Sequence, residues 1–294
     1  MRYALPDLSL RELLRTLLAA TACLILGCAD HPTAQDGGEP LASYLRVALT
    51  FTRDLAGTRF DAQGHFVRYR TAEREPVAAL LGLPQQIDRT QPIDTCRWVD
   101  GAGTIERALQ TISRVELLDA GRLVVKGPEE ATLLHPWHYP ELTPFVTGVV
   151  YGVEEGRALA LGGGARYEVV SEGGEEITPF VAQATAPQAF PSLIVAPYRV
   201  GSDLELSWSA PRQEETEPLQ LTLTWSARGA REVRCRVRDR GAFHIPAALV
   251  PTGMEPTRGA NAEMTAIRVR RAPLAGSGEL EIGLREVLPL PLAE

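Results

Sequence analysis

From Leu41 onward, large apolar residues recur at every second position, and this alternation constrains the fold more than any other feature of the sequence. The clearest runs are residues 45–51, 204–208, 219–225, 233–237 and 243–245. Successive side chains of a strand point to opposite faces, so each run predicts a strand with one buried face. The 26 glycines and 22 prolines supply the turns that short strands need. The predicted fold class is mainly β, with two antiparallel, sandwich-like β domains.

Residues 182–192 are the predicted boundary between the two domains. This segment is rich in alanine and proline and contains no charged residue. The N-terminal domain would span residues 43–185, and the C-terminal domain residues 190–294. A length of 294 residues, at about 100–200 residues per domain, also favours two domains.

Two hairpins are predicted in the C-terminal domain. A register that sets Trp225 opposite Val233 and Leu223 opposite Cys235 buries the apolar side chains of both strands together. In the last hairpin, apolar residues would face apolar ones and arginines would face glutamates: Ile267 and Val269 with Ile282 and Leu280, and Arg268 and Arg270 with Glu281 and Glu279.

The N-terminal domain carries one helix candidate and a meander. Apolar residues of the segment 104–117 fall at helical spacing, although Val115–Leu117 would equally begin a strand. Glycine-bearing turns then separate four predicted strands: 145–151, 157–161, 166–170 and 176–182.

The segment Asp203–Pro211, with the sequence DLELSWSAP, resembles the tryptophan-bearing strand of fibronectin type III domains. This resemblance implies an immunoglobulin-like (Ig-like) sandwich for the C-terminal domain.

The first 28 residues have the layout of an export signal. Three arginines precede an uncharged stretch, residues 16–27, that is rich in leucine and alanine and ends in small residues. Its 12 residues are too few for a bilayer-spanning helix, which needs about 20. The residues Leu24–Cys28 resemble the lipobox of bacterial lipoproteins. The resemblance implies that residues 1–27 are a cleaved signal peptide, that Cys28 is lipidated, and that Ala29 directs the chain to the outer membrane.

Residues 28–42 would then form a polar tether that holds the β domains away from the membrane. The alternative is a cytosolic β protein with an N-terminal amphipathic helix. In that case Ser9 and Glu12 would form a capping box, and residues 10–26 would be a buried helix.

Four cysteines become informative once the signal is removed. Cleavage removes Cys23 and lipidation occupies Cys28, which leaves Cys96 and Cys235 as one possible pair in an oxidising compartment. The other interpretation is that Cys235 is a free, buried thiol unrelated to Cys96. Spacing alone leaves both open.

The segment His135–Glu141, with the sequence HPWHYPE, is the first candidate site. Its histidines and glutamate are zinc-ligating types, and Trp137 and Tyr139 would stack on a sugar or peptide. Two prolines prevent the helix that would bring His135 and His138 to one face, so no metal site is predicted. A proline-rigidified connection with half-buried Trp137 and Tyr139 is the default interpretation.

The second candidate site is a stripe of alternating arginines: Arg234, Arg236, Arg238 and Arg240. In the predicted register its neighbours are threonines, so part of its charge would be free to bind an anionic glycan or an acidic protein. The alternative is the solvated face of an amphipathic strand, which also protects a sheet edge.

Catalysis has little support in the sequence. The chain contains no Gly-x-Ser-x-Gly elbow, phosphate-binding loop, zincin histidine pair or Cys-x-x-Cys motif, and no catalytic residue or cofactor is predicted. A net charge of -7 argues against a general nucleic-acid binder. The predicted function is an exported cell-envelope lipoprotein that acts as a binding or structural module. The alternative of a different class is an envelope hydrolase of glycan or peptide with a site near His135–Glu141.

Overall fold

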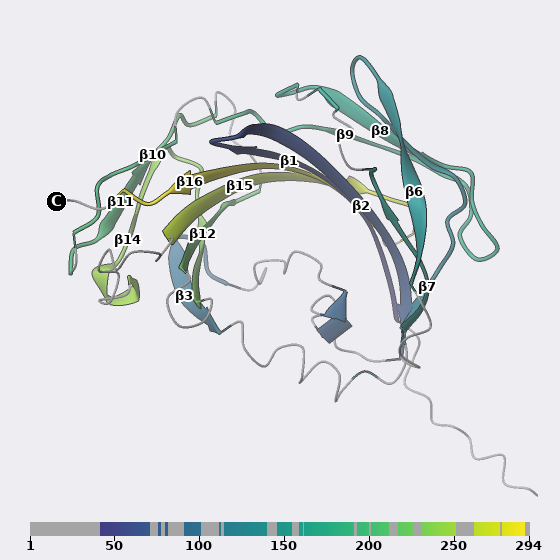
Figure 1. Cartoon of the computed structure of the whole chain (residues 1–294), viewed down its shortest axis with the longest axis horizontal. Helices are drawn as coiled ribbons and strands as arrows, with labels where there is room; N and C mark the ends of the chain where they lie inside the picture. Colours follow the sequence, from purple (N-terminus) through teal and green to yellow (C-terminus); the bar gives the residue numbers. More distant parts are fainter. Residues whose placement is uncertain are drawn as a thin grey trace, which may run out of the picture. The chain divides into compact units, whose positions relative to one another are not determined.

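A computed structural model shows a mainly β protein, which confirms the predicted class (Figure 1). All described residues belong to one compact unit, Pro40–Glu294. The structure describes these residues: 42–70, 76–77, 80–81, 91–100, 112, 115–139, 146–154, 159–160, 162–190, 193–199, 201–211, 217–225, 231–250, 262–276 and 278–291. The predicted signal peptide, Cys28 and most of the tether lie outside them.

Sixteen strands and one 3₁₀ helix make up the elements of the described part of the chain. In order they are β1 (Ala42–Asp54), β2 (Gly57–Tyr69), β3 (Thr95–Asp100), β4 (Val115–Leu117), β5 (Leu123–Lys126), β6 (Ala131–Tyr139), β7 (Val146–Gly152), β8 (Arg166–Ser171), β9 (Phe180–Thr185), β10 (Ile194–Val195), β11 (Leu204–Ser207), β12 (Leu219–Trp225), β13 (Arg231–Val237), β14 (Ala242–Ile245), η1 (Ala247–Leu249), β15 (Ala262–Pro273) and β16 (Glu279–Pro289). Within the described residues, no helix has the length and apolar character needed to cross a membrane.

Thirteen of these strands form one sheet, in the order β3-β13-β12-β15-β16-β1-β2-β4-β7-β6-β5-β8-β9 (Figure 1). The strands β10, β11 and β14 form a second sheet. Most pairs are antiparallel, as predicted, but β1 runs parallel to β16 and β4 runs parallel to β7. The pairing of β1 with β16 joins the beginning and the end of the described chain within one sheet.

The first apolar core lies between strands β1, β2 and β16 and strands β5, β8 and β9. Phe51 illustrates its packing, since its ring lies 5.0 Å from that of Phe60 and 5.3 Å from that of Tyr167. Leu280 and Ile282 of β16 are fully buried in the same cluster. The C-terminal hairpin therefore completes the core of the N-terminal half.

The second apolar core lies between the three-stranded sheet and strands β12, β13 and β15. The alternating residues of β12 and β13 enter it as predicted, among them Leu221, Leu223 and Val233, which are all fully buried. Trp208, which follows β11, is also buried there. This arrangement of two facing sheets is a β-sandwich.

The buried residues of the second core all lie at or after residue 190, where the predicted boundary at residues 185–190 ends, whereas the first core takes residues from both sides of it, among them Phe51 and Leu280. The division into domains 43–185 and 190–294 stays a prediction. Strands β15 and β16 carry residues of both cores on one face, among them Ala266 in the second and Leu284 in the first.

Both predicted hairpins form, but their registers differ from the predictions. In the first, Leu223 lies opposite Val233 and Leu221 opposite Cys235, a shift of two residues. A shift of two leaves every side chain on the same face, so apolar alternation cannot distinguish the two registers.

The predicted register of the last hairpin was wrong by three residues, which exchanges the two faces. Arg268 lies opposite Leu284 and Arg270 opposite Ile282, whereas Ile267 lies opposite Arg285. Apolar residues occupy both faces of β15, so its alternation did not reveal which face is the core face.

Part of the predicted N-terminal meander is also corrected. Strand β8 forms a hairpin with β9, but β9 begins only at Phe180. On its other side β8 pairs with β5, and not with β7 as a meander would require. Within the helix candidate 104–117, Val115–Leu117 form strand β4. Residues 104–111 of the helix candidate and most of the predicted strand 157–161 lie outside the described residues.

Arg268 is buried beside the junction of the two cores, with only 2% of its side chain exposed. Its Nε donates to Asp239 Oδ2 at 2.6 Å and its Nη2 to Asp239 Oδ1 at 3.0 Å. The remaining N–H groups donate to the carbonyl oxygens of Gln188, Ala189 and Ser209. One guanidinium thus fixes two residues of the predicted boundary segment to β15 and to the second core.

We predict that Arg268→Ala lowers the free energy of unfolding by about 3–5 kcal/mol, because it leaves Asp239 buried without its counter-charge. Urea denaturation measures this loss. The matched control is Arg122→Ala, which removes a 62% exposed arginine and should cost within about 0.5 kcal/mol. Equal stabilities of the Arg268 and Arg122 variants would contradict this role of the buried pair.

Candidate functional site

The first candidate segment lies in a strand. Residues His135–Tyr139 belong to β6, so the predicted proline-rigidified connection was wrong. His135 and His138 are three positions apart in an extended chain and therefore face opposite sides of the sheet. Trp137 is 57% exposed, more than the half-buried position expected. Glu141 and the side chain of Tyr139 lie outside what the structure describes.

No metal centre is assembled by the residues that the structure describes, since no three of their His, Cys, Asp or Glu side chains form a group able to hold a metal ion. The exposed ring of Trp137 leaves the ligand-stacking interpretation of this segment as a prediction.

Arg234 and Arg236 of the arginine stripe lie on β13, and Arg238 and Arg240 follow this strand. β13 is not an edge strand, because β3 pairs with it on the outer side. Three arginines of this stripe have polar partners in the structure. Arg234 donates to Glu232 at 2.6 Å, and Arg236 donates to the carbonyl oxygen of Gln91 at 2.8 Å. Arg238 lies 3.4 Å from Asp94. Binding of an anionic partner to Arg234, Arg236 and Arg238 stays a prediction.

The structure contains the disulfide between Cys96 and Cys235, one of the two alternatives that the sequence left open. The two cysteines are cross-strand partners on β3 and β13, and they are separated by 139 residues in the chain. The bond ties the edge strand to the second core.

We predict that the double variant Cys96→Ala, Cys235→Ala loses about 2–5 kcal/mol of unfolding free energy, because a long loop is no longer closed in the unfolded chain. Urea denaturation of the oxidised protein and the variant measures the difference. Alkylation before and after reduction checks the bond, and two reactive thiols in the native protein without reductant would contradict it.

A polar groove of about 350 Å³ lies on the other face of the large sheet, across strands β12, β15, β16, β1 and β2. Its residues alternate along each strand with residues of the two cores. Five charged side chains line it: Arg46, Asp61, Arg271, Glu281 and Arg285. The neutral polar lining is Thr50, Thr52, Gln63 and Gln220, and the rest is Ala48, Ile267, Val269 and Gly283.

Arg46 is the most unusual residue of this groove, because only 1% of its surface is exposed. Its Nη2 donates to Glu281 Oε1 at 2.5 Å. Its Nε and Nη1 atoms are buried and have no hydrogen-bond partner in the structure. A buried donor without an acceptor costs about 1–3 kcal/mol, and more when it is charged.

The burial of Arg46 follows from its neighbours along β1. Two residues away, Tyr44 packs with Val67 in a third apolar cluster on the same face of the sheet. On the other side, Ala48 and Thr50 form part of the groove lining. Arg46 thus lies where an apolar cluster meets a polar hollow.

A chain of ion pairs holds the charged end of the groove. Glu281 accepts from Arg271 at 3.1 Å as well as from Arg46. Arg271 also lies 2.8 Å from Glu217. Glu281 and Glu217 therefore supply two carboxylates for the two arginines.

His65 lies opposite Arg46 on the neighbouring strand β2 and is also buried. Burial and the charge of Arg46 lower the pKa of His65 from 6.5 to about 4. The imidazole is therefore neutral at pH 7, and its Nδ1 is a further buried atom without a partner.

We predict that His65 makes the fold sensitive to mild acid. Above pH 6.5 this histidine is neutral in both the folded and the unfolded chain. Between pH 6.5 and about 4 it takes up a proton only in the unfolded chain. The unfolding free energy should fall by up to about 3 kcal/mol across this interval because of His65 alone.

Urea denaturation at several pH values tests this. His65→Phe should flatten the decline relative to the wild type, whereas His138→Phe, at an exposed position on β6, should leave it unchanged. Parallel curves for the wild type and His65→Phe would contradict the assignment.

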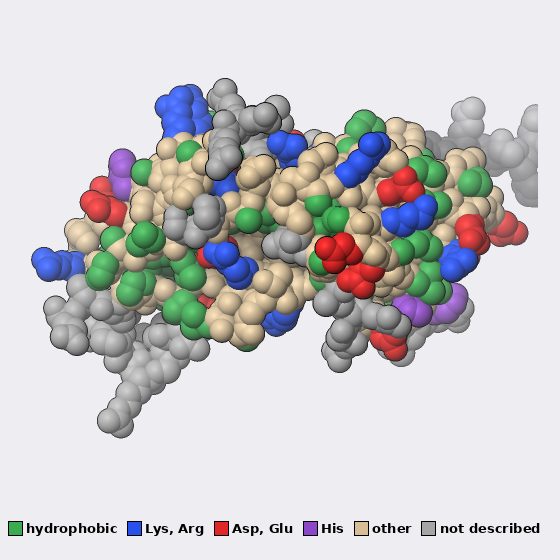
Figure 2. Space-filling model, turned by 90° about the horizontal axis from the view of Figure 1, so that it is seen from above, with side chains coloured by type: hydrophobic (Ala, Val, Ile, Leu, Met, Phe, Trp, Pro, Cys, Tyr) green, Lys and Arg blue, Asp and Glu red, His purple; other side chains and the backbone are tan. Residues whose placement is uncertain are grey.

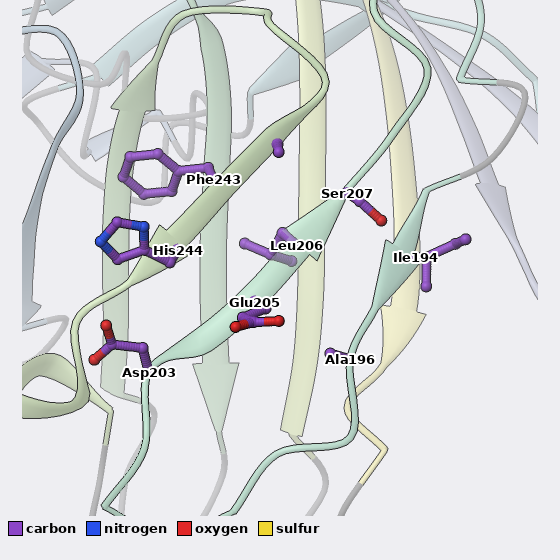
Figure 3. Close-up of a pocket in the computed structure, with 9 residues that line it drawn as sticks. Ile194, Ala196, Asp203, Glu205, Leu206, Ser207, Phe243 and His244 are labelled. Carbon is purple, nitrogen blue, oxygen red and sulfur yellow. The ribbon is translucent and has the colours of Figure 1, made fainter.

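A second hollow, of about 510 Å³, lies on the three-stranded sheet (Figure 3). Glu205 and His244 are cross-strand partners there, and both are exposed to solvent. Asp203 accepts a hydrogen bond from the N–H of Ala247 at 2.8 Å. None of its lining residues carries a buried polar atom without a partner, so the polar groove is the stronger candidate.

Tyr151 belongs to a structural network in the first core. Its hydroxyl donates to Asp119 and accepts from the N–H of Ala120 at 2.8 Å. Burial raises the pKa of this phenol above its usual value, and the hydrogen bond to Asp119 raises it further. The tyrosine therefore stays protonated and holds the turn after β4 in place.

The face shown in Figure 2 carries basic and acidic side chains interspersed among apolar and neutral ones. Such mixing produces no extended field of one sign on that face.

Comparisons with known proteins give no relative from which a function would follow. No family model and no curated protein matches the chain. One of the solved structures it resembles is a segment of two fibronectin type III domains from chicken tenascin, at 14% identity and a TM-score of 0.21. That likeness covers 57% of this chain and 82% of the tenascin segment, and at this TM-score it carries no argument about the fold or the function.

Proposed function

We propose that this chain is an exported lipoprotein of the cell envelope, anchored through Cys28, whose β unit acts as a binding module. The predicted signal peptide 1–27, the tether 28–42 and an outer-membrane address through Ala29 are parts of this proposal.

The observation that carries the proposal of export is the disulfide between Cys96 and Cys235. Disulfides persist in oxidising compartments outside the cytosol. The sequence reason for export and this structural bond are independent, because they involve different cysteines. Together they favour the envelope over the cytosolic alternative.

The polar groove supports binding over a purely structural role. Charged and polar side chains gather in this groove on a sheet face that is not part of either core, as a site for a polar ligand requires. For the hydrolase alternative near His135–Glu141, the opposite orientation of His135 and His138 on β6 is unfavourable, because the two imidazoles do not converge on one substrate.

Mass spectrometry of the protein purified from the membrane fraction tests the proposed anchor. We predict a mature N-terminus at Cys28 that carries a diacylglyceryl thioether and an N-acyl chain. Cys28→Ser should stay unlipidated and keep its signal peptide.

The matched control is Cys23→Ser, which changes a cysteine inside the proposed signal and should leave lipidation intact. An unprocessed chain that begins at Met1 and carries no lipid would overturn the proposed export and anchoring.

A further inference from the structure

We propose that the polar groove binds a neutral saccharide, which lies on the sheet face around Gly283. This inference rests on the proposed function as a binding module and names the chemistry of its ligand.

Gly283 lies inside strand β16, on the floor of the groove. Its neighbours are Val269 on β15 and Thr50 on β1. A glycine inside a strand has no side chain to pack and loses more conformational entropy on folding than other residues. Such a glycine is explained by a positive φ, by a crowded neighbour, by a bulge, or by the close approach of a ligand or another backbone.

The first three reasons do not apply to Gly283. Its φ is not positive, and a Cβ atom there would lie 3.8 Å from the nearest atom, Ile267 Cγ2, at ordinary van der Waals distance. Strand β16 pairs with β1 and β15 in unbroken register through residue 283, so there is no bulge. In contrast, Gly148 on β7 has a φ of 117°, and a Cβ at Gly64 on β2 would lie 3.0 Å from Leu123. Close approach of a ligand to the floor is the reason that we assign to Gly283.

The charges around the groove balance, which favours a neutral ligand. The arginines in its lining are Arg46, Arg271 and Arg285, and the carboxylates are Asp61 and Glu281. Glu217, which is ion-paired with Arg271 at 2.8 Å, supplies a third carboxylate. The described groups therefore sum to zero at pH 7, and a charged ligand would have to compete with pairs that already exist.

The lining combines an apolar floor with polar sides. Ala48, Val269 and Gly283 are buried and form part of the floor. The partly exposed side chains of Thr50, Thr52, Gln63 and Gln220 offer both donors and acceptors. A sugar ring matches this pattern, because its C–H groups form an apolar face and its hydroxyls surround that face. The hollow of about 350 Å³ lies at the lower end of the usual range for small-molecule sites, so disaccharides are suitable probes.

The position of the groove within the sheet favours a saccharide over an extended peptide. Its five strands, β12, β15, β16, β1 and β2, each lie between two neighbours in the strand order. Extended peptides are typically bound by adding a strand at a sheet edge. A ligand in this groove instead meets side chains on a sheet face.

Saturation-transfer NMR on the purified protein tests the proposal with three neutral disaccharides: maltose, cellobiose and N,N′-diacetylchitobiose. Digalacturonate is the charged counterpart, and N-acetyl-Ala-Ala-amide is the neutral peptide. We expect at least one neutral disaccharide to bind about tenfold or more tightly than digalacturonate and than the peptide.

Variants of Gly283 separate binding from folding. Gly283→Ala should raise the urea midpoint, because alanine fits there and is favoured over glycine inside a strand. Gly283→Val should keep a midpoint at or above that of the wild type and abolish disaccharide binding, because its side chain fills the hollow. The matched control is Ala131→Val, at an exposed position of β6 outside the groove, which should bind as the wild type.

Thr50→Val provides a second variant should Gly283→Val fail to fold. It keeps the branched shape that suits a strand and removes one hydroxyl from the lining. The disaccharide should bind about threefold or more weakly to Thr50→Val than to the wild type.

Three results overturn the proposal. One is that no neutral disaccharide binds more tightly than digalacturonate and the peptide. Another is that binding persists unchanged in folded Gly283→Val or Thr50→Val. The third is a lowered urea midpoint of Gly283→Ala, which would show that the fold itself requires this glycine. All three are independent of the N-terminal mass measurement, so failure of this site and failure of the proposed anchor are distinguishable.

Discussion

The buried pair of Arg268 and Asp239 is the interaction on which the rest of this structure depends. Two apolar cores share one sheet, and the segment that connects the halves of the chain passes from Ala186 in the first core to Phe190 in the second. Arg268 satisfies the carbonyls of Gln188 and Ala189 while its charge is matched by Asp239. Trp208 Nε1 also donates to Asp239, at 2.6 Å, so the same carboxylate orients an aromatic ring of the second core. Arg53 supports the crossing from β1, where it donates to the carbonyl of Phe190 and to Glu286.

Much of the fold could be predicted from the alternation of apolar and polar residues. The errors in the predicted strand registers have a physical cause. Strands such as 219–225 and 233–237 have apolar residues on one face only, so their burial follows from the sequence alone. Their register does not, because a shift of two residues preserves both faces. The last hairpin was assigned to the wrong face because Arg268 reads as a surface residue until its partners are known, and those partners are 29 to 80 residues away in the chain. The parallel pairing of β1 with β16 has no local signal, since it joins strands more than 200 residues apart.

The polar groove also depends on contacts that the sequence does not reveal. In the sequence, Arg46 occupies a polar position of an alternating strand, which is where a solvated arginine would also stand. Its burial comes from Tyr44 and Val67 on one side and from the sheet around it, and neither can be seen in the spacing of residues along β1. The arginine stripe at and after β13 misleads in the opposite direction. Its regular spacing indicated a free cationic face, but Arg234 and Arg236 are bound to Glu232 and to the Gln91 carbonyl. An unsatisfied guanidinium can be found only by counting partners in three dimensions.

Because one continuous sheet and the Arg268 contacts join the two cores, we expect residues 40–294 to unfold as a single cooperative unit. Native-state hydrogen exchange, followed by mass spectrometry at increasing denaturant, tests it most directly. Peptides from β2 report on the first core and peptides from β12 on the second. The account predicts that the slowest amides of both open with the same free energy and the same dependence on denaturant. Two distinct opening free energies, one for each half of the chain, would contradict it.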